Sequence, residues 1–214
     1  MDAIDNASDF PRQPLQQRAK DRFEIVIEGA RKLLREKGLS GFSIPELATR
    51  LGYSRATIYN FFPTPYTIFN ELTRRYLDQL EQALYGEAAN LREIPWQRSA
   101  EAMAAFAAHF YNENPVACLL ILGGPVTDES YRAQELMIQR LGQLVQQTLA
   151  NRGIRLPSGP PDISLLTIEI GTTCLRVSFF LHGRITPHYQ REAGRAMISY
   201  LSQYVPNALP DRVD

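Results

Sequence analysis

Residues 41–62 hold the side chains of this sequence whose types and spacing point most clearly to a chemistry. Arg55 carries two donors that match the acceptors of guanine, and the amide of Asn60 matches adenine. The methyl groups of Thr57 and Ala56 can contact thymine. These groups recognise base edges by hydrogen bonding and contact, which favours a binding function over the making or breaking of bonds.

Hydroxyl groups accompany these residues. Ser43, Ser54 and Tyr59 are suited to phosphate oxygens, which fix the position of a protein on a nucleic acid rather than its sequence preference. The amino ends of two short predicted helices would add free backbone amides and partial positive charge. The segment therefore predicts a surface that binds a nucleic-acid duplex.

Two short helices joined by a tight turn are predicted to hold these side chains. Ser43 opens the first helix in a capping box that Glu46 completes, and that helix stops near Gly52. Ser54 caps the second helix, which is expected to span 55–61. The inward-facing residues of the pair are Leu47, Ala48, Leu51, Ile58 and Phe61 or Phe62. This layout is that of a helix-turn-helix, whose second helix enters the major groove.

The charges of the 214-residue chain sum to zero but are unevenly distributed. Residues 10–76 hold twelve basic and six acidic side chains, a net charge of +6, whereas residues 77–214 carry −3. A basic first third favours an anionic partner, although a solvated helix surface would give the same pattern. The four basic residues Arg12, Arg18, Lys20 and Arg22 could form an arm that reaches the DNA, or could simply keep the N-terminus soluble.

Over about residues 20–80 the sequence resembles the DNA-binding domain of TetR-family (tetracycline-repressor-like) transcriptional regulators. The motifs that carry the likeness are Gly38, Ser43, Leu47-Ala48, Gly52-Tyr53-Ser54 and Tyr59-Asn60-Phe61-Phe62. The resemblance implies phosphate contacts from Ser43, Ser54, Thr57, Tyr59 and the backbone of Phe61. It implies base contacts from Tyr53, Arg55, Ala56 and Asn60.

One position departs from the family pattern. The family usually has a Lys where this chain has Pro65, at the start of the following helix. Proline starts a helix well, and Thr64 can cap it. The ammonium that would hold a phosphate is nevertheless missing, and Tyr66 or Arg74 could compensate for it.

Helical periodicity and capping signals continue to the end of the chain, which predicts an all-α fold of about nine helices. Beyond the first three, the expected helices span 64–89, 95–111, 115–123, 128–151, 162–183 and 187–204, with a loop at 152–161. The β-branched segment 167–177 could be read as a strand, but its length favours a buried helix.

Three regions with different roles are expected. Residues 1–64 would form an N-terminal arm and the helix-turn-helix domain. Residues 65–205 would form a helical ligand-binding and dimerisation domain, as the resemblance implies, and residues 206–214 a flexible tail. The last two helices carry more apolar surface than one monomer needs, which predicts a homodimer through them.

A small-molecule pocket is expected in the C-terminal domain, lined by aromatic and apolar residues with a few polar groups. The candidates for it are Phe106, His109, Phe110, Leu122, Tyr131, Thr173, Arg176 and Phe179. Further apolar candidates are Trp96, Met103, Leu119, Met137, Leu141 and Leu175. The same stripes could equally be packed core. If buried, Arg176 would need a partner, either Glu169 or an anionic ligand.

Several classes of protein are disfavoured. Two cysteines and three histidines without ligand spacing predict no metal site, and no cofactor motif is present. The chain lacks a nucleophile with a base, so an enzyme is not expected. Charged residues interrupt the most apolar stretch, 165–185, so no membrane span is predicted and a cytoplasmic protein is expected.

The sequence therefore predicts a dimeric, ligand-responsive regulator that binds double-stranded operator DNA. It would most simply be a repressor that a small, largely apolar effector releases from the operator. The alternative is a DNA-bound dimeric regulator with no small-molecule ligand.

Overall fold

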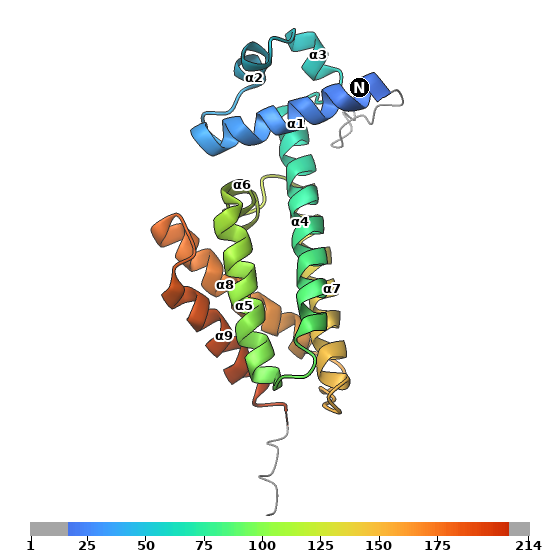
Figure 1. The fold of residues 1–214 in the computed structure, drawn as a ribbon, viewed down its shortest axis with the longest axis vertical. Helices are drawn as coiled ribbons and strands as arrows, with labels where there is room; N and C mark the ends of the chain where they lie inside the picture. The colour runs from blue at the N-terminus through green and yellow to red at the C-terminus, as the bar shows by residue number, and fades with distance from the viewer. Residues whose placement is uncertain (1–16, 206–214) are drawn as a thin grey trace, which may run out of the picture. The chain divides into compact units, whose positions relative to one another are not determined.

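The computed structural model describes residues 17–205, and all regular structure in that range is helical (Figure 1). The elements in chain order are α1 (Gln17–Lys37), α2 (Ile44–Leu51), α3 (Arg55–Tyr59), α4 (Pro65–Asn90), α5 (Trp96–Glu113), α6 (Pro115–Ala117), the π-helical segment η1 (Cys118–Leu122), α7 (Asp128–Ala150), α8 (Ile163–His182) and α9 (Pro187–Leu201). The predicted all-α fold is confirmed, and segment 167–177 is helical. Arg12 of the predicted arm and the predicted tail 206–214 lie outside the described residues.

Several helix ends differ from the sequence prediction, among them that of α9, which ends at Leu201 rather than near residue 204. α3 ends at Tyr59 rather than at Phe61, because the chain closes a tighter turn in which the Phe61 amide donates to the Ile58 carbonyl at 3.0 Å. The helix predicted from Pro115 is one α-helical turn that continues as η1. A π-helical segment has no periodicity of its own at this length, so the pattern of apolar residues does not reveal it.

The described chain divides into two compact units. The first contains the residues up to Tyr76 together with Pro115–Ala133, and the second contains Leu77–Asn114 and the residues from Gln134 onward. The boundary expected after residue 64 precedes α4, whereas the structural division falls within α4. The first turns of α4 belong with the first unit because they pack against α1.

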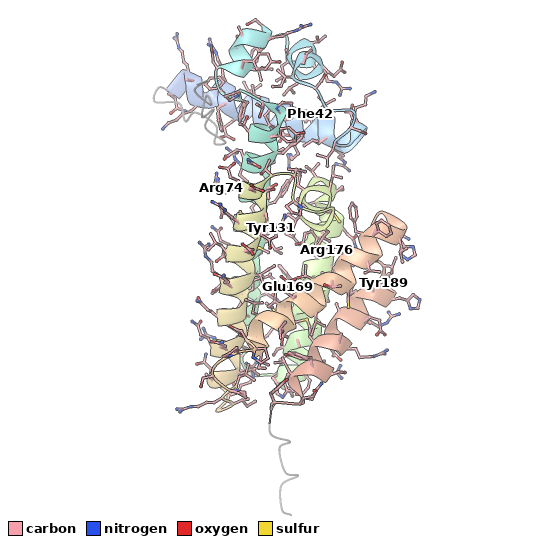
Figure 2. All side chains as sticks on the ribbon, turned by 180° about the vertical axis from the view of Figure 1, so that it is seen from behind. Phe42, Arg74, Tyr131, Glu169, Arg176 and Tyr189 are labelled. Atoms are coloured by element: carbon pink, nitrogen blue, oxygen red, sulfur yellow. The ribbon has the colours of Figure 1, made fainter. Side chains whose placement is uncertain are left out.

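The core of the first unit is built on one face of α1. The buried residues of that face recur with a helical period: Phe23, Val26, Ile27, Ala30, Leu33 and Leu34. Gly29 lets α2 approach closely, since a Cβ at this position would lie 2.8 Å from Leu51 Cδ2. Phe42, in the loop before α2, packs edge-on against Phe69 of α4 with 5.0 Å between ring centroids (Figure 2). α1 is thus the scaffold on which the two short helices are held.

A polar network joins segment 115–133 to α4 within the same unit. Thr127 Oγ1 donates to Asn70 Oδ1 at 2.6 Å, and Asn70 Nδ2 donates to Glu129 Oε2 at 2.6 Å. The buried Ser130 hydroxyl accepts from the Thr127 amide at 3.0 Å. Buried polar groups satisfied in this way specify one arrangement of the segments that carry them.

In the second unit α8 and α9 pack along each other, and α9 also lies against α5 (Figure 1). Glycines permit these close approaches. A Cβ at Gly171 of α8 would lie 2.6 Å from Met197 Sδ of α9, and a Cβ at Gly194 would lie 3.2 Å from Glu101 Cα of α5. Small residues therefore set the spacing of the three helices.

α8 is long and apolar enough to cross a membrane by length and composition, although its sequence contains charged residues. One or two helices of this kind are weak evidence, because core helices of soluble proteins pass the same test. Only 33% of its apolar window is buried inside the chain. The exposed part includes Val177, Phe180 and Leu181.

Candidate nucleic-acid interface and ligand cavity

The ends of α2 follow directly from its sequence. Ser43 Oγ accepts from the Glu46 amide at 3.3 Å, while the Glu46 carboxylate accepts from Arg50 Nε at 2.9 Å. Only the Ser43 half of the predicted capping box is therefore formed. Gly52 ends the helix with φ +65°, a left-handed conformation that glycine adopts without strain, and the Tyr53 amide donates to the Ala48 carbonyl at 3.0 Å.

α3 begins with a pair of joined hydroxyl groups. Ser54 Oγ accepts from the Thr57 amide at 3.1 Å, and the two side-chain oxygens lie 2.8 Å apart. This contact orients both predicted phosphate ligands before any DNA is bound. Ile58 is the buried residue of α3, so its side chain fixes which face of the helix points outward.

The predicted DNA-contacting residues divide by exposure. The exposed ones are Ser54, Arg55, Ala56, Tyr59 and Asn60, and the half-buried ones are Ser43, Tyr53, Thr57 and Phe61. The Phe61 ring contacts Phe23 edge-on at 6.0 Å between centroids. Because that ring is engaged with α1, the Phe61 backbone is the part of this residue available to a ligand, as the sequence implies.

Five cations of the first unit are paired with carboxylates: Arg31, Lys32, Arg50, Arg74 and Arg75. Arg50 bridges Glu36 and Glu46, and Glu28 pairs with α1 cations. Within residues 17–205, seven cations of this unit have no carboxylate partner: Arg18, Lys20, Arg22, Arg35, Lys37, Arg55 and Arg132. Three of these lie in the first two turns of α1 and one on α3, where an approaching polyanion would find unpaired charge.

The position of the missing family Lys is occupied by Pro65, the first residue of α4. The adjacent Tyr66 is 55% exposed, with its ring edge-on to Phe69 at 6.0 Å. Arg74 donates to the Glu71 carboxylate at 2.9 Å. Of the two residues that could compensate, Tyr66 is thus the one that lies next to Pro65 in the first turn of α4, whereas Arg74 is paired with Glu71.

An ion-pair cluster fastens α4 to α1. The buried carboxylate of Glu71 accepts from both Arg74 and Arg75, and Arg75 also donates to both oxygens of Glu24 at 2.6 and 2.7 Å. The Arg75 guanidinium lies over the Phe23 ring, 5.7 Å from its centroid. The cluster holds the helix that follows the helix-turn-helix against the scaffold helix.

Acid should weaken this cluster. The hydrogen bond from Arg75 lowers the pKa of Glu24 from its ordinary value of 4.5. A carboxylate whose pKa is lowered by folding stabilises the fold above its unfolded pKa, and this contribution is lost as the pH falls through the folded pKa. Thermal unfolding at pH 7 and pH 3.5 is therefore expected to show a smaller acid-induced fall in Tm for Glu24→Gln than for the unmodified protein. Equal falls in Tm for the two proteins would mean that ionisation of Glu24 does not contribute to the loss of stability in acid.

The second unit encloses a cavity of about 120 Å³ among α4, α5, α7, α8 and α9. Its wall is largely aliphatic, with Trp96 and the two thioethers of Met103 and Met197. The hydroxyl groups in the lining are Ser99, Thr148, Thr167 and Thr172. A largely apolar pocket with a few polar groups in its wall is the usual form of a small-molecule site.

The eight predicted pocket residues do not line this cavity. His109, Thr173 and Arg176 are exposed, and Phe106, Phe110 and Phe179 are half-buried outside its wall. Leu122 and Tyr131 belong to the first unit. Arg176 and Glu169 both lie on α8 (Figure 2), and exposure removes the need for Arg176 to find a buried partner. Of the further candidates, four do line the cavity: Trp96, Met103, Leu141 and Leu175.

The cavity lies between small side chains rather than between aromatic ones. α5 turns Ala100, Ala104 and Ala107 toward it, and α8 contributes Gly171 at the centre of its lining face. Alanines at helical spacing on an otherwise apolar helix were the sequence signal for this space, because small residues leave volume that aromatic residues fill. The aromatic residues predicted as lining lie on other faces of α5 and α8 than the residues that line this cavity.

The family model described as "Bacterial regulatory proteins, tetR family" matches residues 26–72. This range begins within α1, contains α2, α3 and the turn between them, and ends in α4. Residues 26–72 are therefore similar to the corresponding segment of TetR-family regulatory proteins. The matched range covers the helix-turn-helix region and does not include any residue that lines the cavity. No curated protein matches the chain.

Solved structures with the same fold extend over nearly the whole chain. A protein from Mesorhizobium loti, described as a TetR-family transcriptional regulator, is 20% identical with a TM-score of 0.65, covering 89% of this chain and 100% of its own. SmeT, the repressor of the Stenotrophomonas maltophilia multidrug efflux pump SmeDEF, is 16% identical with a TM-score of 0.64, covering 89% and 95%. The multidrug binding protein EbrR, complexed with imidazole, is 16% identical with a TM-score of 0.63, covering 90% and 98%.

These identities, all below 25%, show the fold alone, and the family match extends over residues 26–72. TetR-family proteins are DNA-binding transcription regulators and not enzymes, in agreement with the sequence analysis. Members of the family act as dimers on operator DNA and bind small-molecule effectors.

Proposed function

We propose that this TetR-family regulator is a homodimeric repressor that a small, largely apolar molecule releases from its operator. The observation that carries the proposal is the apolar cavity of the second unit, about 120 Å³ in volume. A cavity in a natural core costs stability through the contacts its lining forgoes, so its presence favours a use for the space.

The proposed DNA surface consists of the residues predicted from the sequence. Arg55, Ala56, Tyr53 and Asn60 would contact bases, and Ser43, Ser54, Thr57, Tyr59 and the Phe61 backbone would contact phosphates. Two features support this assignment: Ile58 directs the opposite face of α3 into the core, and Arg55 has no carboxylate partner within the described residues. Tyr66 would add a phosphate contact at the start of α4, in place of the family Lys.

Arg55→Ala and Tyr59→Phe are expected to separate base from phosphate contacts. Loss of Arg55 should cost about 1–3 kcal/mol on the preferred sequence and relax the preference at one base pair. Loss of the Tyr59 hydroxyl should weaken binding almost equally on all sequences. Fluorescence anisotropy on a set of single-base operator variants measures both effects, and equal losses on all sequences for Arg55→Ala would reduce its role to a phosphate contact.

The proposed dimer forms through α8 and α9. Val177, Phe180 and Leu181 of α8 are exposed in the single chain, and Phe180 retains 84% of its accessible surface. An apolar face of this kind on a soluble regulator is best buried by a second copy of the same face, in a four-helix arrangement. A two-fold dimer supplies the two helix-turn-helix heads that a palindromic operator requires.

Release would follow from differential binding. An effector that binds more tightly to a conformation with wrongly spaced heads lowers the operator affinity of the dimer by the same free energy. α4 is continuous from the first unit into the second and is the proposed transmitter. A protein with this role would act in the cytoplasm, where its DNA is.

A gel-shift titration of the purified protein on the DNA upstream of its own gene tests the regulator role, with scrambled competitor and two salt concentrations. A specific complex that weakens steeply with salt is expected, because phosphate contacts release counterions. The alternative, a regulator without a ligand, would bind the same DNA but show no rise in Tm with any apolar compound.

A further inference from the structure

The lining of the cavity contains no ionisable side chain. Of its four hydroxyl groups, two are committed to the backbone: Ser99 Oγ donates to the Leu91 carbonyl at 3.1 Å, and Thr167 Oγ1 donates to the Ile163 carbonyl at 2.7 Å. A charged ligand would therefore enter a space in which nothing replaces its hydration. Burial of an unpaired ion is strongly unfavourable in such surroundings.

One cation lies directly behind the wall. Arg152 Nη2 donates to Ser99 Oγ at 2.9 Å and to the Leu91 carbonyl at 2.6 Å, and Nη1 donates to the Thr148 carbonyl at 2.8 Å. Its Nε and Nη2 also approach the Ile94 carbonyl. Within residues 17–205 it has no carboxylate partner, so it presents a fixed positive charge that repels a cation. Its Nε and Nη2 donors, which face Ser99 in the wall and the Leu91 and Ile94 carbonyls, are already used by neutral oxygens.

The size and shape of the cavity define the rest of the ligand. A cavity of about 150 Å³ lined by apolar side chains stays dry and holds a benzene-sized molecule, and this one is about 120 Å³. Met103 and Met197 can adjust their rotamers around a ring, and thioethers make favourable contacts with aromatic edges. Thr148 and Thr172 carry hydroxyl groups, from α7 and α8, that could meet one polar group.

We infer that the cavity selects a compact, uncharged ring compound with at most one hydrogen-bonding group, and that it rejects cations and anions of the same size. The inference rests on the proposed function, since it names the ligand class of the same site. The polar group meets Thr148 or Thr172, and the ring lies against Met103 and Met197.

A size-matched series tests the inference on the full chain: benzyl alcohol, benzylammonium and benzoate, at pH 7. Isothermal titration calorimetry and the ligand-induced rise in Tm give the three affinities. Benzyl alcohol is expected to bind at least tenfold more tightly than either ion. The inference would be overturned if the affinity for benzyl alcohol exceeded the affinity for either ion by less than tenfold.

Two variants tie the binding to this cavity. Ala107→Phe fills it, whereas Ala89→Phe places the same side chain at an exposed position of α4 as a control. Benzyl alcohol binding is expected to fall at least tenfold in the first variant only, and equal binding in both would overturn the inference. Met103→Ala enlarges the cavity. This variant should bind the larger compound 1-naphthylmethanol at least tenfold more tightly than the unmodified protein does. If its affinity for this compound does not rise, the inference is also overturned.

Operator binding measured in the same solutions distinguishes this inference from the proposed function. If a charged analogue binds in the cavity and releases the DNA, the ligand class is wrong and the effector role remains. If benzyl alcohol binds in the cavity and the DNA stays bound, the ligand class is supported and the proposed effector role fails.

Discussion

Phe180→Asp is expected to convert the protein from a dimer to a monomer and to lower its operator affinity about 100-fold or more. Phe180 is 84% exposed in the single chain, so the substitution disturbs little within one copy. In the proposed dimer the ring is buried against the partner, and burying a Phe side chain contributes about 1.5–3 kcal/mol per copy. The variant loses this contribution twice and adds two carboxylates to an apolar interface.

The loss of DNA affinity follows from the two-fold operator. A monomer binds one half-site, whereas the second half-site of a dimer is bound at the high effective concentration that the linkage provides. Sedimentation velocity gives the assembly state, and fluorescence anisotropy on full and half operators gives the affinities. The Phe180→Asp variant should bind the full operator and the half operator with equal affinity.

Leu136→Asp is a matched control, because Leu136 is 51% exposed on α7 and outside the proposed interface. It is expected to remain dimeric with unchanged DNA affinity. If Leu136→Asp dissociates the dimer and Phe180→Asp does not, the interface lies on α7 rather than on α8 and α9.

The helix ends of the candidate DNA surface could be predicted because they depend on local chemistry. Ser43 and Ser54 cap their helices with their own side chains, and Gly52 adopts the left-handed conformation that ends α2. The orientation of α3 also follows from sequence, because one buried residue, Ile58, determines which face of a short helix remains outside. These features need no knowledge of distant parts of the chain.

The cavity could not be located in this way. Whether the face of α5 with Phe106 and Phe110 or the face with Ala100 and Ala107 points inward depends on how α9 and α4 pack around it. Both faces are apolar, so periodicity gives no preference between them. The same limit applies to η1, where a one-residue change of helical register inside an apolar run leaves no mark in the sequence.

Arg152→Met is expected to lower the free energy of unfolding by about 2–4 kcal/mol. Arg152 lies just beyond α7 and donates to the carbonyls of Leu91, Ile94 and Thr148 and to the Ser99 hydroxyl. It thereby joins the connection between α4 and α5 to the end of α7. Methionine keeps the length of the apolar stem but removes every donor, and carbonyls that lose a charged donor without regaining water are costly.

Arg155→Met is the matched control, since Arg155 is exposed three residues further along the same loop and makes no hydrogen bond within the described residues. Urea denaturation followed by circular dichroism measures both variants, and Arg155→Met should lie within about 0.5 kcal/mol of the unmodified protein. Because Arg152 also fixes Ser99 in the cavity wall, its loss should raise the affinity for benzylammonium relative to benzyl alcohol. Equal stabilities for the two variants would mean that water replaces the guanidinium at all four acceptors, and that the connection between α4 and α5 is held by apolar packing alone.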